Sequence, residues 1–397
     1  MRRKWYILIA MTLLIFILIL SILVFVHELG HFLMAKRAGI YVEEFGFGLP
    51  PRIFGKKIGE TIYSINALPI GGFVKLYGEN GENENVSTEK LVTSYKRAYF
   101  EKSIWQRLAV LLAGVTMNLL LGIVVFYVLY FVYGIPTKTG KITVEGIAKS
   151  SPAELSELKI GDQIISLDGQ KLTKMDEFIF LTKSKAGNPI KLEIAREKDN
   201  PCKTGSEDVL GGMTTAEGTG FNCNGENLIV TLIPRTNPPA DEGPLGVAIT
   251  DTEMKKYPWY QMPFLGVAEG FKESLTWGKM IVSSLGQTVF VLVTKGQVPK
   301  DVAGPIGIFQ VTGQVAQAGF LAILQFLGIL SVNLAIINIL PLPALDGGRL
   351  IFLAYEGIFK KRANPKVEDL VNKLGMAFLL SLMVLITIND ILRLVRK

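Results

Sequence analysis

Residues 6–31 read YILIAMTLLIFILILSILVFVHELGH, and this stretch decides the fold class. Its first 21 residues, Tyr6 to Val26, carry no charged side chain. About 20 apolar residues are enough for a helix to cross the ~30 Å hydrocarbon core of a bilayer. A cleaved signal peptide would have a shorter apolar region and a small-residue cleavage site, and neither is evident. The stretch therefore predicts a transmembrane helix that ends at two histidines.

The composition of the whole chain also indicates a membrane protein. Of its 397 residues, 49% are hydrophobic and only 19% are charged, and the mean hydropathy is +0.36. This composition excludes disorder, and two cysteines are too few for a disulfide-dense secreted scaffold. A net charge of +7 in so apolar a chain indicates basic loops beside anionic lipid. We therefore expect the lipid bilayer as a partner and no nucleic acid.

Three further stretches are apolar enough to cross the membrane: 108–133, 320–343 and 374–388. Residues 264–294 are apolar too, but charged side chains fill the first half. We interpret this stretch as an amphipathic helix that lies on the membrane or packs beside the bundle. The sequence thus predicts four transmembrane helices.

The loop charges predict which side of the membrane is which. The segments reached after the first and third crossings, residues 34–107 and 347–373, hold 17 Lys and Arg, against 6 in the two tails on the other side. The positive-inside rule makes the loop side cytoplasmic. Two crossings separate His27 and His31 from Asp346, so all three are expected near the cytoplasmic face of the membrane.

The chain has two histidines, and they stand four residues apart in His27-Glu28-Leu29-Gly30-His31. Residues i and i+4 lie on one face of a helix, so both imidazoles can bind one Zn²⁺. Glu28 can take a proton from the attacking water. The alternative is two helix-end histidines with local hydrogen bonds only, but histidine at the end of an apolar crossing is costly without a role. We therefore predict one catalytic zinc ion.

A catalytic zinc ion has three protein ligands and one open position, and no third histidine exists. Cys202 and Cys223 are expected on the opposite side of the membrane. Asp346 lies in PLPALDGG (341–348), where prolines interrupt the helix and glycines permit a tight turn. Asp346 is thus the candidate for the third ligand, and Glu356 on the same side is its competitor.

Several stretches together resemble the bacterial site-2 protease family, of the regulator-of-sigma-E protease type. These stretches are His27–His31, Gly46–Gly48, Leu68–Lys75, Val302–Gly307, Asn333–Asn338 and Pro341–Gly348. The resemblance implies an intramembrane zinc metalloprotease of the bacterial plasma membrane. Its substrates would be single-span membrane proteins, such as an anti-sigma factor or remnant signal peptides, cut in regulated intramembrane proteolysis. The resemblance assigns zinc to His27, His31 and Asp346 and the general base to Glu28.

Residues 61–77 predict a β-hairpin. TIYSINAL and FVKLY are rich in β-branched and aromatic residues, and they flank Pro69-Ile-Gly-Gly72, which predicts the turn. An exposed edge here could pair with an unwound substrate by strand addition, or the hairpin could simply cover the zinc site. The resemblance implies a re-entrant β-structure on the cytoplasmic side of the membrane. The candidate substrate-binding residues are Gly71, Gly72, Phe73, Asn338 and Pro341.

Gly114 and Asn118 on the second crossing resemble the family's Ala-Gly-Pro-x-x-Asn stretch, with Val115 in place of the proline. Close helix packing explains the two residues as well as a functional role does. The sequence leaves both explanations open.

Residues 138–234 have the composition of a soluble domain. SPAE (151–154) and LKIGDQIISLDG (158–169) resemble the core of one extracytoplasmic PDZ domain, with Glu157 where the family commonly has glycine. Ser151 can cap a short helix that Pro152 opens, and residues 164–167 predict a strand. A PDZ groove would bind an extended peptide, or the domain would act as a size filter that excludes intact ectodomains.

A polar insertion at residues 198–227 holds Cys202 and Cys223. A disulfide between them fits an oxidising extracytoplasmic compartment. The alternative is two free thiols.

We thus predict an α-helical polytopic membrane protein with four transmembrane helices, a cytoplasmic-side re-entrant β-hairpin and an extracytoplasmic PDZ (α+β) domain. A transporter or channel would need ionisable residues at several depths, and the second and fourth crossings have none in their apolar centres. A scaffold acting through its PDZ domain would not need Glu28. The predicted parts are 1–135 (two helices and the β-structure), 136–238 (PDZ domain), 239–317 (linker and amphipathic helix) and 318–397 (two helices).

Overall fold

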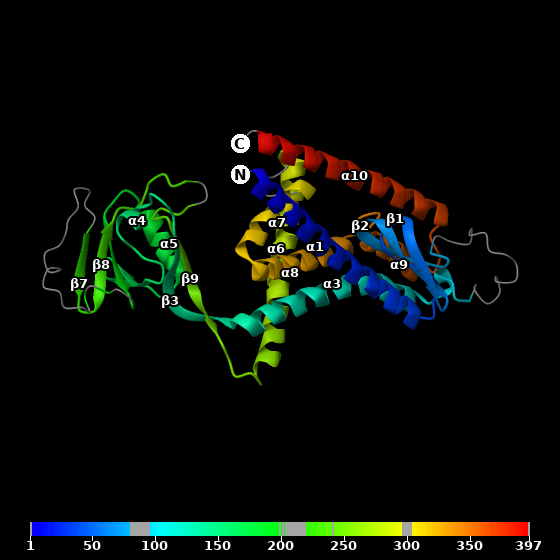
Figure 1. The fold of residues 1–397 in the computed structure, drawn as a ribbon, viewed down its shortest axis with the longest axis horizontal. Coiled ribbons are helices and arrows are strands. Elements are labelled where there is room, and N and C mark those ends of the chain that lie inside the picture. Colours follow the sequence, from blue (N-terminus) through cyan, green and yellow to red (C-terminus); the bar gives the residue numbers. More distant parts are fainter. Residues whose placement is uncertain are drawn as a thin grey trace. The chain divides into compact units, whose positions relative to one another are not determined.

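The computed structural model describes residues 2–79, 96–197, 200, 202, 220–239, 242–295 and 304–395 (Figure 1). The chain divides into two compact units. Unit 1 consists of Met1–Val132 together with Pro258–Lys397, and unit 2 consists of Tyr133–Tyr257.

Unit 1 is mainly helical. Within the described residues, four helical stretches are long and apolar enough to cross a membrane, and they match the four predicted crossings. These stretches are Tyr6–Arg37, Ile104–Tyr133, Phe320–Ile339 and Lys366–Leu392. They belong to helices α1 (Arg2–Arg37), α3 (Ile104–Tyr133), α8 (Phe320–Ile339) and α10 (Pro365–Val395). The protein is therefore a multi-pass membrane protein.

Helix α1 continues beyond its apolar stretch as far as Arg37, so the two histidines lie within one unbroken helix. Glycine lets this helix approach α3 closely, because a Cβ on Gly30 would stand 2.4 Å from the carbonyl oxygen of Ala113. Nearer the N-terminus, Ile19 and Leu23 of α1 are buried in one apolar cluster with residues of α3 and α8. These contacts fix the position of the histidines against α3.

Helix α6 (Met262–Lys295) contains the predicted amphipathic segment and packs beside the apolar helices. A Cβ on Gly270 would stand 2.8 Å from the carbonyl oxygen of Ile123 on α3. Helix α7 (Pro305–Ala318) follows, and the buried Asp390 carboxylate of α10 accepts hydrogen bonds from the backbone N–H groups of Gly304 and Gly307. Residues 302–303 of the family-like stretch lie outside the described residues.

Two long strands, β1 (Val42–Ile58) and β2 (Thr61–Leu76), form the β-structure of unit 1. Residues 44–47 of β1 pair with both 62–65 and 72–75 of β2, so β2 folds back on itself in between. The prediction of a chain reversal near residues 69–72 fits this register. The prediction that the flanking stretches pair with each other is wrong, because residues 44–47 lie between them.

Unit 2 is built on a seven-stranded sheet with the order β7-β8-β6-β4-β3-β9, and β5 pairs with β4. Helices α4 (Pro152–Leu155) and α5 (Met175–Ser184) accompany the sheet. The strands are β3 (Ile135–Ile147), β4 (Gln163–Leu167), β5 (Gln170–Lys171), β6 (Ile190–Ala195), β7 (Gly220–Asn224), β8 (Asn227–Leu232) and β9 (Val247–Lys255).

Alternating apolar residues of the sheet form the core of unit 2. Ile190, Leu192 and Ile194 of β6 are fully buried and point to one face, as the period of two in a strand requires. Ser151 caps α4 as predicted, because its side chain accepts a hydrogen bond from the backbone N–H of Glu154. Unit 2 thus has an apolar core of its own.

The boundary and the cysteines of unit 2 also bear on the sequence analysis. We expected residues 239–317 to hold a linker and an amphipathic helix, but β9 in that range pairs with β3. Sheet pairing of a segment distant in sequence explains why the boundary at 238 falls short of Tyr257. Cys202 and Cys223 are joined by a disulfide. Residues 198, 199, 201 and 203–219 of the predicted insertion lie outside the described residues.

Candidate metal centre

Two histidines of α1 meet an aspartate that lies more than 300 residues further along the chain. His27 and His31 lie one turn apart, with 3.1 Å between their Nε2 atoms. Asp346 is the first residue of helix α9 (Asp346–Phe359). Its Oδ2 atom lies 3.1 Å from Nε2 of His27 and 3.3 Å from Nε2 of His31. The structure thus brings together all three predicted ligands.

The donor atoms of this cluster fit a zinc ion. Zinc with bonds of ~2.0 Å in tetrahedral geometry separates its ligand atoms by ~3.3 Å, close to the observed spacing of 3.1 to 3.3 Å. Oδ2 of Asp346 is buried and has no hydrogen-bond partner among the described residues. A buried carboxylate oxygen without a partner is costly, and a bound cation would remove that cost.

Groups on α3 orient both imidazoles. Nδ1 of His31 lies 2.8 Å from the carbonyl oxygen of Val110, which can only accept, so Nδ1 carries the proton and Nε2 is left as a ligand atom. Nδ1 of His27 lies 3.3 Å from the amide of the fully buried Asn118. Oδ1 of Asn118 has no partner among the described residues, and turning the amide by 180° would let it accept from Nδ1–H of His27. A ligand histidine commonly donates its other N–H in this way.

Gly114 makes room for the histidines. A Cβ at this position would stand 2.4 Å from Nε2 of His31 and 2.7 Å from Cε1 of His27. The sequence left packing and function open for Gly114 and Asn118. Both residues contact the histidines, and their spacing of four residues, like that of the histidines, is the signal that could have indicated this role.

The tight turn before α9 explains how Asp346 reaches the histidines. A Cβ on Gly347 would stand 2.0 Å from the carbonyl oxygen of Leu340, and one on Gly348 would stand 2.3 Å from that of Leu342. Only glycine permits this approach of α9 to the end of α8. The approach turns the first residue of α9 back toward α1.

Glu28 lies beside β2. A Cβ on Gly72 would stand 3.4 Å from Cγ of Glu28, and the backbone N–H of Val74 interacts favourably with the Glu28 carboxylate. Phe73 covers Gly46, and Gly71 lies against Leu49. The strand therefore passes directly beside the candidate general base.

The remaining predicted residues differ in their distance from the cluster. Nδ2 of Asn338 lies 3.4 Å from Nε2 of His27, so Asn338 borders the three candidate ligand atoms. Pro341 is exposed in the turn before α9. The competing ligand Glu356 is bound instead by Arg107, with distances of 2.6 and 2.9 Å between oxygen and nitrogen atoms. The pairing with Arg107 holds the pKa of Glu356 below its ordinary value.

The chain matches peptidase family M50 over residues 15–382. It therefore belongs to this family, the site-2 proteases, and the resemblance seen in the sequence is confirmed. The protein is a zinc metalloprotease of the kind involved in regulated intramembrane proteolysis.

Three bacterial proteins are similar to this chain over almost their whole length. A Clostridium perfringens protein that carries a zinc metalloprotease name is 34% identical, with 95% of this chain and 97% of the relative covered. The zinc metalloprotease RasP of Geobacillus kaustophilus is 31% identical, with 95% and 96% covered. The regulator of sigma-W protease RasP of Bacillus subtilis is 30% identical, with 96% and 99% covered.

Proposed function

We propose that this protein hydrolyses peptide bonds within the transmembrane segments of single-span membrane proteins, with one zinc ion held by His27, His31 and Asp346. The observation that carries the proposal is the convergence of two imidazole nitrogens and an otherwise unpartnered carboxylate oxygen within 3.3 Å of one another. Such a set fits a three-ligand catalytic zinc site.

In this proposal Glu28 is the general base. Bound zinc would polarise the scissile carbonyl group. Glu28 takes a proton from the attacking water and passes it to the leaving amine. The backbone of β2 at Gly72 and Val74 lies beside the Glu28 side chain. Val110 and Asn118 keep the imidazoles oriented.

The substrate would bind as an extended strand along β2. Within the described residues, 72–74 pair on one side only, with 45–47. A transmembrane helix must lose its own backbone hydrogen bonds before it can be cut, and an open strand edge offers replacement partners. Gly71, Gly72 and Phe73 would supply this edge beside Glu28. The amide of Asn338 would contact the substrate backbone close to His27.

We further propose the orientation of the protein in the bacterial plasma membrane. The excess of Lys and Arg in residues 34–107 and 347–373 supports a cytoplasmic position for the metal centre and the β1–β2 structure. Unit 2 would then be an extracytoplasmic PDZ domain. An oxidising compartment on that side would favour the disulfide between Cys202 and Cys223. Unit 2 would contact a peptide or the ectodomain of the substrate. Anti-sigma factors and remnant signal peptides are the substrate classes we favour.

The substitution Glu28→Gln tests the catalytic proposal. We expect cleavage of a single-span membrane substrate by the full-length protein to fall by ~10²- to 10⁴-fold, the usual contribution of a general base. Zinc content should remain that of the wild type, because no ligand is changed. Glu101→Gln, which removes a carboxylate on the 3₁₀ turn Tyr99–Glu101, is the matched control and should cleave normally. Undiminished cleavage by Glu28→Gln would refute the role of Glu28.

A further inference from the structure

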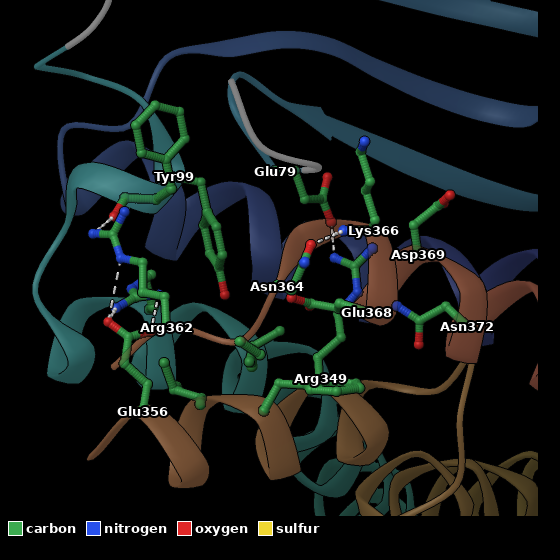
Figure 2. Close-up of a pocket in the computed structure, with 16 residues that line it drawn as sticks. Glu79, Tyr99, Arg349, Glu356, Arg362, Asn364, Lys366, Glu368, Asp369 and Asn372 are labelled. Atoms are coloured by element: carbon green, nitrogen blue, oxygen red, sulfur yellow. Dashed lines mark hydrogen bonds and ion pairs between the residues drawn. The ribbon is translucent and has the colours of Figure 1, made fainter. Parts of the chain in front are cut away.

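A cavity of about 830 Å³ lies in unit 1 between the end of β2, the N-terminal part of α3, helix α9 and the start of α10 (Figure 2). Charged side chains of both signs line it. Figure 2 shows Glu356 and Arg362 at one end and Arg349 with Glu79 at the other. Helix α9 contributes both Arg349 and Glu356 to this wall, and the same helix begins with Asp346.

The strongest of these interactions joins α9 to α3. Arg107 and Glu356 meet through two parallel hydrogen bonds of 2.6 and 2.9 Å, which is the two-pronged geometry that guanidinium and carboxylate groups favour. Their side chains are only 8% and 15% exposed. Nε of Arg107 also donates a hydrogen bond to the carbonyl oxygen of Lys102, at 3.1 Å. Arg107 is thus held in one orientation when it binds Glu356.

Helix α9 is closely packed at its beginning, and Leu353 in its middle is buried. Gly347 and Gly348 pack against the carbonyl oxygens of Leu340 and Leu342, just after α8, so the first turn is closely packed. Glu356 lies ten residues after Asp346, which corresponds to ~15 Å along a helix. A rigid helix held at one end can still swing about that point. The contact with Arg107 at the far end removes this freedom.

A second contact also restrains helix α9. Arg349, one turn after Asp346, forms an ion pair with Glu79 just beyond β2. Arg362, which follows α9, lies 3.4 Å from Oε1 of Glu356, but its side chain is half exposed. Among these contacts, the buried pair of Arg107 and Glu356 is the one least screened by water.

We propose that Arg107 and Glu356 are positioning residues that hold α9 at the tilt at which Asp346 meets His27 and His31. The pair itself touches neither the ligand atoms nor the substrate edge of β2. Its effect on the reaction passes through the backbone of α9. This inference rests on the proposed role of Asp346 as a zinc ligand.

Zinc affinity of the full-length protein in detergent, measured by competition with a chromophoric chelator, tests the inference. We expect Glu356→Gln to weaken zinc binding on the order of tenfold, the lower range for residues that support a metal ligand. The absorption spectrum of the Co²⁺-substituted protein should change as well, because the geometry of the ligands changes. Lys373→Met is the matched control, because it removes a well-exposed ion pair with Asp369 on α10 and should leave both measurements unchanged.

A double variant guards against a folding defect. A lone buried charge destabilises a protein, whereas two apolar residues in place of the pair are often tolerated. Arg107→Met combined with Glu356→Met should therefore melt close to the wild-type temperature and still bind zinc more weakly. Wild-type affinity in a folded Glu356→Gln or double variant would overturn the inference. Loss of the fold in both variants would overturn it too, since the pair would then serve the fold as a whole.

Asp346→Asn separates this inference from the proposed function. If Asp346→Asn binds zinc like the wild type, the ligand assignment fails and the inference fails with it. If Asp346→Asn loses zinc while the pair variants keep full affinity, only the positioning role is refuted.

Discussion

The buried residues of unit 2 and those around the metal centre of unit 1 differ in kind. In unit 2, one apolar cluster on the sheet includes Leu192, Val230 and Leu245, each no more than 2% exposed. Around the metal centre, Gly114 lets α3 approach the imidazoles closely, and two of the three buried side-chain atoms that have no partner in the described residues, on Asn118 and Asp346, lie there. The third belongs to Arg235 in unit 2.

This difference indicates that unit 2 and the surroundings of the metal centre depend on different physical effects. Apolar burial stabilises a fold and tolerates changes of shape at moderate cost. Glycine at a helix contact adds little burial, but it sets the distance between backbones closely. The metal centre therefore depends on exact placement, and unit 2 depends on the amount of buried apolar surface and on satisfied buried charges.

Among the changes that test this comparison, Gly114→Ala should have the largest effect on cleavage, and a harmless Gly114→Ala would contradict the comparison. The new methyl group would stand 2.4 Å from Nε2 of His31, so one histidine must move. Displacements of about 1 Å at a catalytic centre can cost ~10²-fold in rate, and we expect at least this loss in cleavage together with reduced zinc content. Gly286→Ala on α6, where a Cβ meets nothing within 4 Å, is the control and should behave as the wild type.

Arg196→Met should have the next largest effect, and it should be confined to unit 2. Arg196 donates two hydrogen bonds to Asp162, which is 1% exposed, so the substitution leaves a buried carboxylate without its cationic partner. We expect a loss of about 3–5 kcal/mol in the free energy of unfolding of unit 2. Hydrogen exchange of unit 2 peptides measures this loss, while zinc content should not change. Equal loosening of α1 peptides would show that the units are not independent.

The control for this change is an ion pair on the surface of the same unit. Lys185→Met removes a partly exposed pair with Asp168, and exposed pairs contribute at most about 1 kcal/mol. If Lys185→Met lost as much free energy of unfolding as Arg196→Met, burial would not explain why one ion pair contributes more than the other.

Glu60→Gln should have the smallest effect on stability, and this effect should depend on pH. Hydrogen bonds from Arg97 and Lys36 lower the pKa of Glu60 to about 2. Because the folded pKa is depressed, the ionised group stabilises the fold fully above the ordinary pKa of about 4.5, and this stability is lost as the pH falls toward 2. Melting temperatures of wild type and Glu60→Gln should therefore differ slightly at pH 7 and converge in acid. A constant difference at all pH values would contradict this explanation.

The parts of the fold that depend on local pattern could be predicted from the sequence. Four uncharged stretches predicted four apolar helices, and the cap at Ser151 followed from residue type and spacing. The family membership followed from short motifs separated by more than 300 residues. Strand pairing could not be predicted in the same way. Residues 44–47 lie between two stretches of β2, and β9 joins a sheet whose first strand lies more than 100 residues earlier. No local sequence pattern predicts either of these strand pairings.

The sequence by itself determined the class of protein, the two histidines and the glutamate between them, because helical spacing and apolar length are properties of a single segment. The sequence favoured Asp346 over Glu356 as the third candidate ligand, but only the tertiary structure shows which carboxylate lies beside the histidines, since the two differ in what surrounds them and not in kind. Arg107 binds one, and the histidines face the other. The tertiary structure also decided that Gly114 and Asn118 serve the histidines, because a distance between two helices is a property of their packing.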